Sequence, residues 1–107
     1  MNSKQKIRDN FRTAVYKRDG FTCRKCGTKR TEDALNAHHI TDRNEMPNGG
    51  YVKENGITLC EGDCHMAAEK FHITGGKEWV EGLHPNDLYK MIGSSYELAV
   101  AASEKLK

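Results

Sequence analysis

The sequence has no long hydrophobic run, and only 36% of its 107 residues are hydrophobic. No segment approaches the roughly 20 apolar residues that a membrane-spanning helix needs, so we expect no membrane partner. The first eleven residues are charged and lead into no apolar stretch, which argues against a secretory signal and favours a cytoplasmic, intracellular protein. Internal repeats and low-complexity tracts are also absent. A single domain over residues 1–107 is therefore expected.

A chain this short and polar buries a modest core, so an additional cross-link is expected. Cys23 and Cys26 form a CxxC pair, and Cys60 and Cys64 form a CxxxC pair. In a reducing compartment such cysteines favour metal binding over disulfides. Four thiolates suit a tetrahedral structural Zn²⁺. Two disulfides or four free thiols are the alternatives.

The charged residues that sum to a net charge of +2 are unevenly distributed along the chain. Residues 1–30 carry ten Lys/Arg and two Asp/Glu, a balance of +8, whereas residues 31–107 have a balance of −6. Such asymmetry indicates a basic face that meets a polyanion, with nucleic acid as the first candidate. A solvated basic helix is the alternative interpretation.

The pattern of apolar and turn residues predicts both helices and strands. Residues 7–18 have helical spacing and end at Asp19-Gly20, residues 35–40 suit a strand, and residues 41–50 read as a loop. Asn55-Gly56 is a turn signal. Residues 64–72 should be helical. A short helix follows, with Asn86 as cap or Pro85 in its first turn, and Ser94 or Ser95 caps a final helix.

The histidines fall in places where their directions can be inferred. His38 and His39 are neighbours on the expected strand and so face opposite sides. His65, Glu69 and His72 share one face of the expected helix. Cys64 lies about 100° from His65 around that helix. This arrangement favours a second metal site apart from the cysteines and leaves one histidine of the doublet as a free base. Surface or core-edge histidines are the alternative.

The segments AVYKRDGFTCRKCG, LNAHHI and ENGITLCEGDCH occur in the order found in HNH endonucleases, and the chain resembles that family over roughly residues 11–72. The resemblance implies an α+β fold. It predicts a small zinc-stapled ββα-metal (HNH) core of about residues 11–72, flanked by an N-terminal helix, with a C-terminal helical extension at residues 73–107.

The resemblance also implies roles for single residues. His38 and His65 would be ligands of a catalytic divalent ion, His39 the general base, and Asn55 the brace of the loop between the strands. His39, Asn55 and His65 thus form the expected catalytic set. Some members have another ligand four residues after the final histidine, where this chain has Glu69. His72 would be a solvent-exposed residue. The structural zinc would be bound by Cys23, Cys26, Cys60 and Cys64.

The function implied is that of a metal-dependent DNA endonuclease. Mg²⁺ or Mn²⁺ is the expected catalytic ion, and imidazole ligands would also accept Ni²⁺ or Zn²⁺. Six cations are candidates for phosphate contacts: Arg12, Lys17, Arg18, Arg24, Lys25 and Arg43. Trp79, Phe71 and Tyr89 read as core residues.

The sequence also allows a second function and partners besides DNA. The alternative function is a zinc-stabilised, non-catalytic DNA-binding or docking module of a phage or mobile-element machine. Cutting both strands usually requires two active sites, so partners besides DNA include a second copy of the chain or a larger phage or mobile-element complex.

Overall fold

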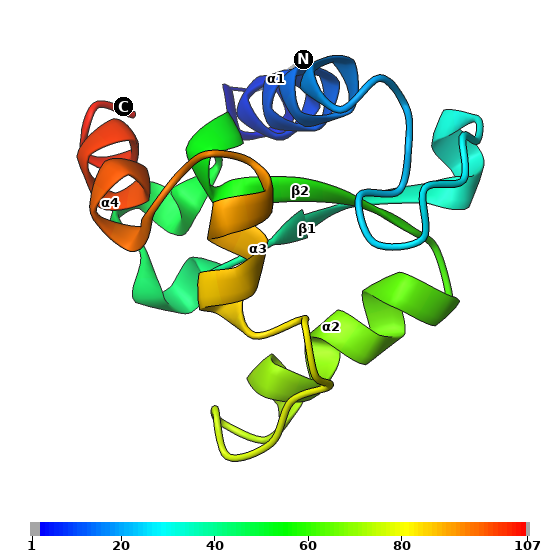
Figure 1. Ribbon diagram of the computed structural model, residues 1–107. Coiled ribbons are helices and arrows are strands. Elements are labelled where there is room, and N and C mark those ends of the chain that lie inside the picture. Colours follow the sequence, from blue (N-terminus) through cyan, green and yellow to red (C-terminus); the bar gives the residue numbers. More distant parts are fainter. Residues whose placement is uncertain (1–2, 107) are drawn as a thin grey trace.

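The computed structural model describes residues 3–106, which combine helices with a two-stranded antiparallel sheet (Figure 1). The strands are β1 (Leu35–His39) and β2 (Gly56–Cys60). The helices are α1 (Ser3–Arg18), α2 (Asp63–Ile73), α3 (Pro85–Met91) and α4 (Tyr96–Glu104). Short 3₁₀ turns η1 (Glu32–Ala34), η2 (Arg43–Glu45), η3 (Pro47–Gly50) and η4 (Lys53–Asn55) occupy the loops. The α+β prediction is confirmed.

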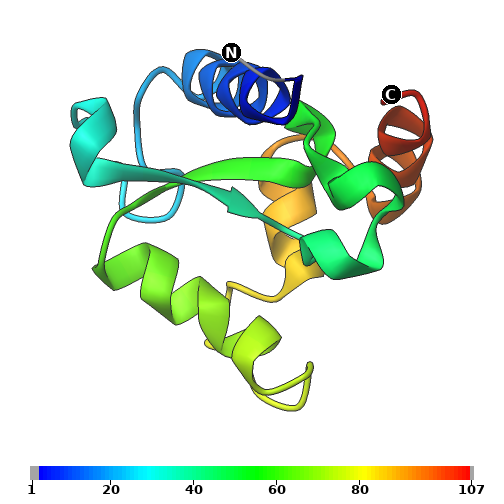
Figure 2. The same cartoon turned by 180° about the vertical axis from the view of Figure 1, so that it is seen from behind.

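The β1–β2 hairpin lies between two helices. α1 crosses one face of the hairpin, and α2 lies against the other face, as Figures 1 and 2 show from opposite sides. The strands pair in a register that places His39 opposite Gly56 and His38 opposite Ile57. Two strands followed by a helix give the ββα arrangement expected from the sequence.

The alternation of side chains along each strand separates two environments. On the α2 face, His38, Ile57 and Leu59 are buried. On the α1 face, Thr58 Oγ1 donates a hydrogen bond to the carbonyl of Val15, and the ring of Phe11 packs on His39. The two histidines of the doublet therefore face opposite sides of the hairpin.

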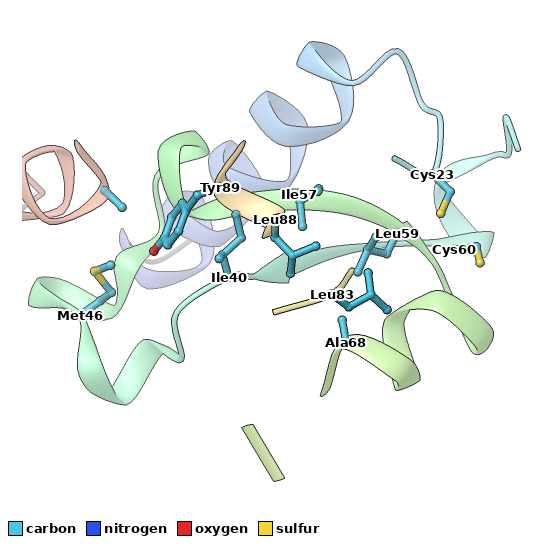
Figure 3. Packing of buried hydrophobic residues seen from close by; sticks show 11 residues of the cluster. Cys23, Ile40, Met46, Ile57, Leu59, Cys60, Ala68, Leu83, Leu88 and Tyr89 are labelled. Atoms are coloured by element: carbon cyan, nitrogen blue, oxygen red, sulfur yellow. The ribbon is translucent and has the colours of Figure 1, made fainter. Parts of the chain in front are cut away.

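The hydrophobic core runs along the hairpin. It extends from Cys23 and Cys60 at one end to Met46 and Tyr89 at the other, with Leu88 from α3 in between (Figure 3). Cys23 and Cys60 both belong to the core cluster, so the cysteines expected to bind zinc pack directly against the apolar core. This arrangement makes the expected cross-link part of the fold.

Gly56 begins β2 with an extended backbone, φ −128°, and does not form the hairpin turn that Asn55-Gly56 suggests. The 3₁₀ turn η4 ends at Asn55 instead. A Cβ at position 56 would lie 2.5 Å from Val15 Cγ2 and 2.7 Å from Phe11 Cε1. Glycine is required here by the close approach of α1, and not by turn geometry.

The segment after α2 folds back on the hairpin. His84 caps α3 by accepting a hydrogen bond from the Asn86 amide at its Nδ1, with Pro85 in the first turn, and Ser95 caps α4. Tyr89 is buried and Phe71 half-buried, but Trp79 is 47% exposed and packs on the rings of Phe71 and His84. The prediction of Trp79 as a core residue is wrong, because its loop lies at the surface.

Candidate active site

Four cysteine sulfurs form the first cluster. The Sγ atoms of Cys23, Cys26, Cys60 and Cys64 all lie within 4.8 Å of one another. Tetrahedral zinc with Zn–S bonds of about 2.3 Å places its sulfurs about 3.8 Å apart, so this donor set fits a structural metal such as zinc. None of the four forms a disulfide.

The two cysteine pairs come from different parts of the fold. Cys23 and Cys26 lie in the loop after α1, where the Cys26 amide donates to Cys23 Sγ at 3.4 Å, as in a metal-binding knuckle. Gly27, with φ 79°, permits the tight turn that follows. Cys60 ends β2 and Cys64 lies in the first turn of α2. A bound metal would therefore tie the post-α1 loop to both the strand and the helix.

A second donor cluster lies between β1 and α2. His38, His65 and Glu69 each present a ligand atom within 4.8 Å of the other two. His38 Nδ1 lies 3.1 Å from Glu69 Oε2, and His65 Nε2 lies 3.6 Å from the same oxygen. The structure thus brings Glu69, which the sequence left uncertain, together with the two predicted ligands. Two imidazoles and a carboxylate are a donor set that divalent metals accept.

The buried His38 supplies a test of that fit. Its side chain is almost fully buried, yet Nδ1 has no hydrogen-bond partner, because its short distance to Glu69 does not come with hydrogen-bonding angles. A buried nitrogen atom without a hydrogen-bond partner destabilises the folded state. A cation held between His38 Nδ1 and the Glu69 carboxylate would satisfy both groups. Burial lowers the pKa of His38, so its imidazole is neutral and able to bind a metal.

Glu61 orients the other imidazole. Nδ1 of His65 lies 3.1 Å from Glu61 Oε1, and a carboxylate can only accept there. His65 Nδ1 therefore donates, which leaves the Nε2 lone pair directed at the cluster. Glu61 was not among the residues predicted from the sequence. Its position four residues before His65 was the available signal.

His72 is not solvent-exposed, contrary to the prediction. Its ring is half-buried and stacks on His38 with centroids 5.3 Å apart, and its Nε2 lies 3.0 Å from the carbonyl oxygen of His39. His72 lies seven residues after His65, so it shares the face of α2 that packs against β1. His72 thus contacts both residues of the doublet, the ring of His38 and the backbone of His39.

His39 lies on the opposite face of β1, between two aromatic rings. Its ring centroid is 4.6 Å from that of Phe11 and 4.8 Å from that of Tyr51. Its Nε2 is buried without a hydrogen-bond partner. Burial, and then the neighbouring His38 and Arg43, lower the pKa of His39 to about 4. The imidazole is therefore neutral at physiological pH and keeps a free lone pair.

Asn55 braces the loop between the strands, as the resemblance implied. Its Oδ1 accepts from the Thr41 amide at 3.0 Å, and its Nδ2 donates to the carbonyls of Thr41 at 3.0 Å and Gly50 at 3.3 Å. The side chain is fully buried. Asn55 thereby closes the loop that begins directly after the histidine doublet.

Two clefts meet at His39. One, of about 270 Å³, is lined by His38, His65 and Glu69, and the other, of about 390 Å³, runs along α1. His39 and Tyr51 line both clefts. Tyr51 was not found from the sequence, where nothing distinguished it from other loop residues.

Cations are unevenly placed around these clefts. Arg12 lines the cleft along α1 together with Arg8, and Arg43 lines the other cleft with its Nη1 3.3 Å from the Tyr51 hydroxyl. Lys17 and Lys25 are exposed but are not among the residues lining either cleft.

Arg18 and Arg24 are engaged within the protein. Both bind the buried carboxylate of Asp19, each with a contact of 2.8 Å, and Arg18 also donates to the carbonyl of Gly56. Arg24 donates to the carbonyl of Met91. Both were predicted to contact phosphate, because the carbonyls of Gly56 and Met91 that they bind lie 38 and 67 residues away and leave no local signal.

Comparison with known proteins identifies the region that contains both donor clusters. The family model of the HNH endonucleases matches residues 23–74, whereas no curated protein and no solved structure gives a significant match. HNH domains generally act on DNA. No helix within residues 3–106 has the length and apolar character to cross a membrane. The region that matches the HNH endonuclease family, residues 23–74, therefore holds both cysteine pairs, the histidine doublet, Asn55 and His65.

Proposed function

We propose that this protein is a metal-dependent DNA endonuclease that hydrolyses phosphodiester bonds, with His39 as general base and with His38, His65 and Glu69 holding the catalytic divalent ion. One observation carries the proposal. Two adjacent histidines have unpaired buried nitrogens on opposite faces of β1, and only His38 faces the His65–Glu69 cluster.

The ligand set favours a hydrolytic metal site. His38 and Glu69 come from two different elements, and His65 is oriented by Glu61, so three donors converge with fixed directions. A bound Mg²⁺ or Mn²⁺, or alternatively Ni²⁺ or Zn²⁺, would stabilise charge on the phosphate and leaving oxygen. Three protein donors leave positions open for substrate and water.

His39 supplies the proton acceptor. Its neutral ring lines both clefts, and we assign the proton-accepting role to Nδ1, because Nε2 is buried, while the phosphate is held at the His38–Glu69 side. Base and ligand must be different residues, since a metal-bound nitrogen has no lone pair left for a proton. The opposite directions of His38 and His39 meet this requirement.

The DNA backbone follows the clefts in this proposal. Arg12 and Arg43 stand on either side of His39, and their positive charge attracts phosphates without reading sequence. Arg8, missed from the sequence, lies on the same path and over the ring of Tyr51, 6.0 Å from its centroid. Lys17 and Lys25 remain candidates for more distant backbone contacts.

The test compares wild type, His39→Ala and His38→Ala on supercoiled plasmid with Mg²⁺, Mn²⁺ or Ni²⁺. We expect cleavage by wild type, loss of turnover with normal metal affinity for His39→Ala, and weakened metal binding for His38→Ala. Circular dichroism and zinc content establish that each variant is folded.

Equal cleavage by wild type and His39→Ala would contradict the assignment of the base. DNA binding without cleavage by wild type in any of the metals would instead support a non-catalytic, zinc-stabilised DNA-binding or docking module. The two unpaired histidine nitrogens favour the enzyme, because a binding module has no use for them.

A further inference from the structure

The segment that follows the family match reaches into the loop beside the doublet. Residues 75–106 lie outside the matched range 23–74, and α3 within them carries Tyr89, whose side chain is 3% exposed. Figure 3 shows the Tyr89 ring from α3 directed toward the loop that joins the strands. A contribution from outside the matched domain to that loop is not part of the function proposed above.

Tyr89 makes two short hydrogen bonds there. Its hydroxyl lies 2.8 Å from Asn55 Oδ1 and 2.7 Å from Thr41 Oγ1. An amide oxygen has no proton to give, so the phenol donates to Asn55 and the Thr41 hydroxyl donates to the phenol. Burial raises the pKa of Tyr89 to about 12, so the donor keeps its proton.

These bonds complete a closed network. Asn55 already binds both the amide and the carbonyl of Thr41, and the amide of Ile40 donates to the Asn55 carbonyl at 2.9 Å. Tyr89 adds a third side chain that holds Asn55 and Thr41 together. Thr41 is two residues after His39, so the network fixes the backbone conformation of the residues that directly follow the doublet.

We propose that Tyr89 is a positioning residue that acts through Asn55 and Thr41 to hold His39 in its orientation between the two clefts. The proposal rests on the proposed function in assigning His39 as the base. Tyr89 touches neither substrate nor metal in this proposal, and the C-terminal segment thereby becomes part of the catalytic unit.

Ser94 provides a matched control. Like Tyr89, it comes from the C-terminal segment and uses a hydroxyl to bind the same loop, donating to the Glu54 carbonyl at 2.9 Å. The hydrogen bonds of its hydroxyl go to the carbonyls of Glu54 and Ser95 and not to the side chains of Asn55 or Thr41. Tyr89→Phe and Ser94→Ala each remove one hydroxyl from this segment, but only the first opens the network.

The experiment uses the full zinc-loaded chain with plasmid DNA and Mn²⁺. For Tyr89→Phe we expect kcat to fall at least tenfold, while KM for DNA and the affinity for Mn²⁺ stay within twofold. Ser94→Ala should keep kcat within twofold. The ring signals of His39 in NMR spectra should shift in Tyr89→Phe and not in Ser94→Ala.

Each result has a defined meaning. Wild-type kcat and unshifted His39 signals in Tyr89→Phe, or equal losses of kcat in both variants, would overturn the positioning role. If wild type does not cleave, the proposed function fails, and the His39 signals alone still decide whether Tyr89 orients this ring. If Tyr89→Phe does not fold, Thr41→Val removes the other hydroxyl and should shift the same signals.

Discussion

Nδ1 of His38 and Oε2 of Glu69 lie 3.1 Å apart across the space between β1 and α2 without forming a hydrogen bond. We propose that the two groups share a metal ion and do not form an ion pair, because burial lowers the pKa of His38 and favours the uncharged imidazole. The pair links a strand residue to a helix residue 31 positions later.

Glu69→Gln should weaken the binding of Mn²⁺ by about 10-fold or more, since it removes a charged oxygen donor from the cluster. Isothermal titration of the zinc-loaded protein measures this affinity. Glu78→Gln is the matched control, because the exposed Glu78 carboxylate forms an ion pair with Lys70 at 3.6 Å and is not part of the donor cluster. Equal affinities for the two variants would remove Glu69 from the ligand set.

Cys26→Ser should release the structural metal. A chromogenic chelator measures zinc release, and thermal unfolding should begin at a lower temperature because a metal bound by the four cysteines would tie three parts of the fold together. Added zinc should restore wild type after chelation but not the variant. A variant that kept both its fold and its melting temperature without zinc would show that the cysteine cluster is dispensable.

Asp19→Asn should destabilise the protein by about 1.5–3 kcal/mol at neutral pH, because Asp19 accepts from two guanidinium groups and from the Thr58 amide at 2.9 Å. Burial raises the pKa of Asp19, but the hydrogen bonds from Arg18 and Thr58 outweigh it and hold the pKa below its usual value. Urea unfolding at several pH values measures both effects.

The sign of the pH dependence follows from that shift. A carboxyl with a lowered folded-state pKa stabilises the fold above its unfolded pKa of about 3.9, and this contribution disappears as pH falls through the folded-state pKa. Wild type should therefore lose stability in acid more steeply than Asp19→Asn. Parallel curves for the two proteins would contradict the role of Asp19.

Gly56→Ala should cost about 1–3 kcal/mol, because its Cβ would overlap Phe11 and Val15. The displaced Phe11 ring packs on His39, so cleavage should also fall. Adding Phe11→Leu to Gly56→Ala should recover part of the stability but not the activity. Chemical denaturation and plasmid cleavage separate the two effects. Unchanged stability in the single variant would be inconsistent with the close approach of α1.

Arg43→Gln should affect DNA binding, whereas Arg18→Gln should affect the stability of the fold. Arg43 is exposed beside the cleft, so its loss should weaken DNA binding and lower the slope of log K against log salt by about 1. Arg18 binds Asp19 and two backbone carbonyls, so its loss should lower the melting temperature and leave the salt slope unchanged. Fluorescence anisotropy with a short duplex gives the slopes.

Much of this fold could be predicted from local sequence patterns. The helix end at Arg18, strand β1, helix α2 and the Ser95 cap follow from periodicity and capping residues, which act over a few positions. The start of α1 at Ser3 could not be predicted from apolar spacing, because residues 3–6 are all exposed. Long-range hydrogen bonds such as those of Asp19 with Thr58, and of Tyr89 with Asn55, could not be predicted from local patterns either.

The available chemistry could be read from local sequence alone. The cysteine spacings and the histidine doublet are visible there, and the two histidines must point in opposite directions because neighbours on a strand alternate. Only the tertiary structure decided that Glu69 joins His38, that His72 is half-buried, and that Arg18 is engaged within the protein. These outcomes depend on how α1 and α2 pack on the two faces of the hairpin. Packing of that kind joins residues far apart in the chain, which no local pattern encodes.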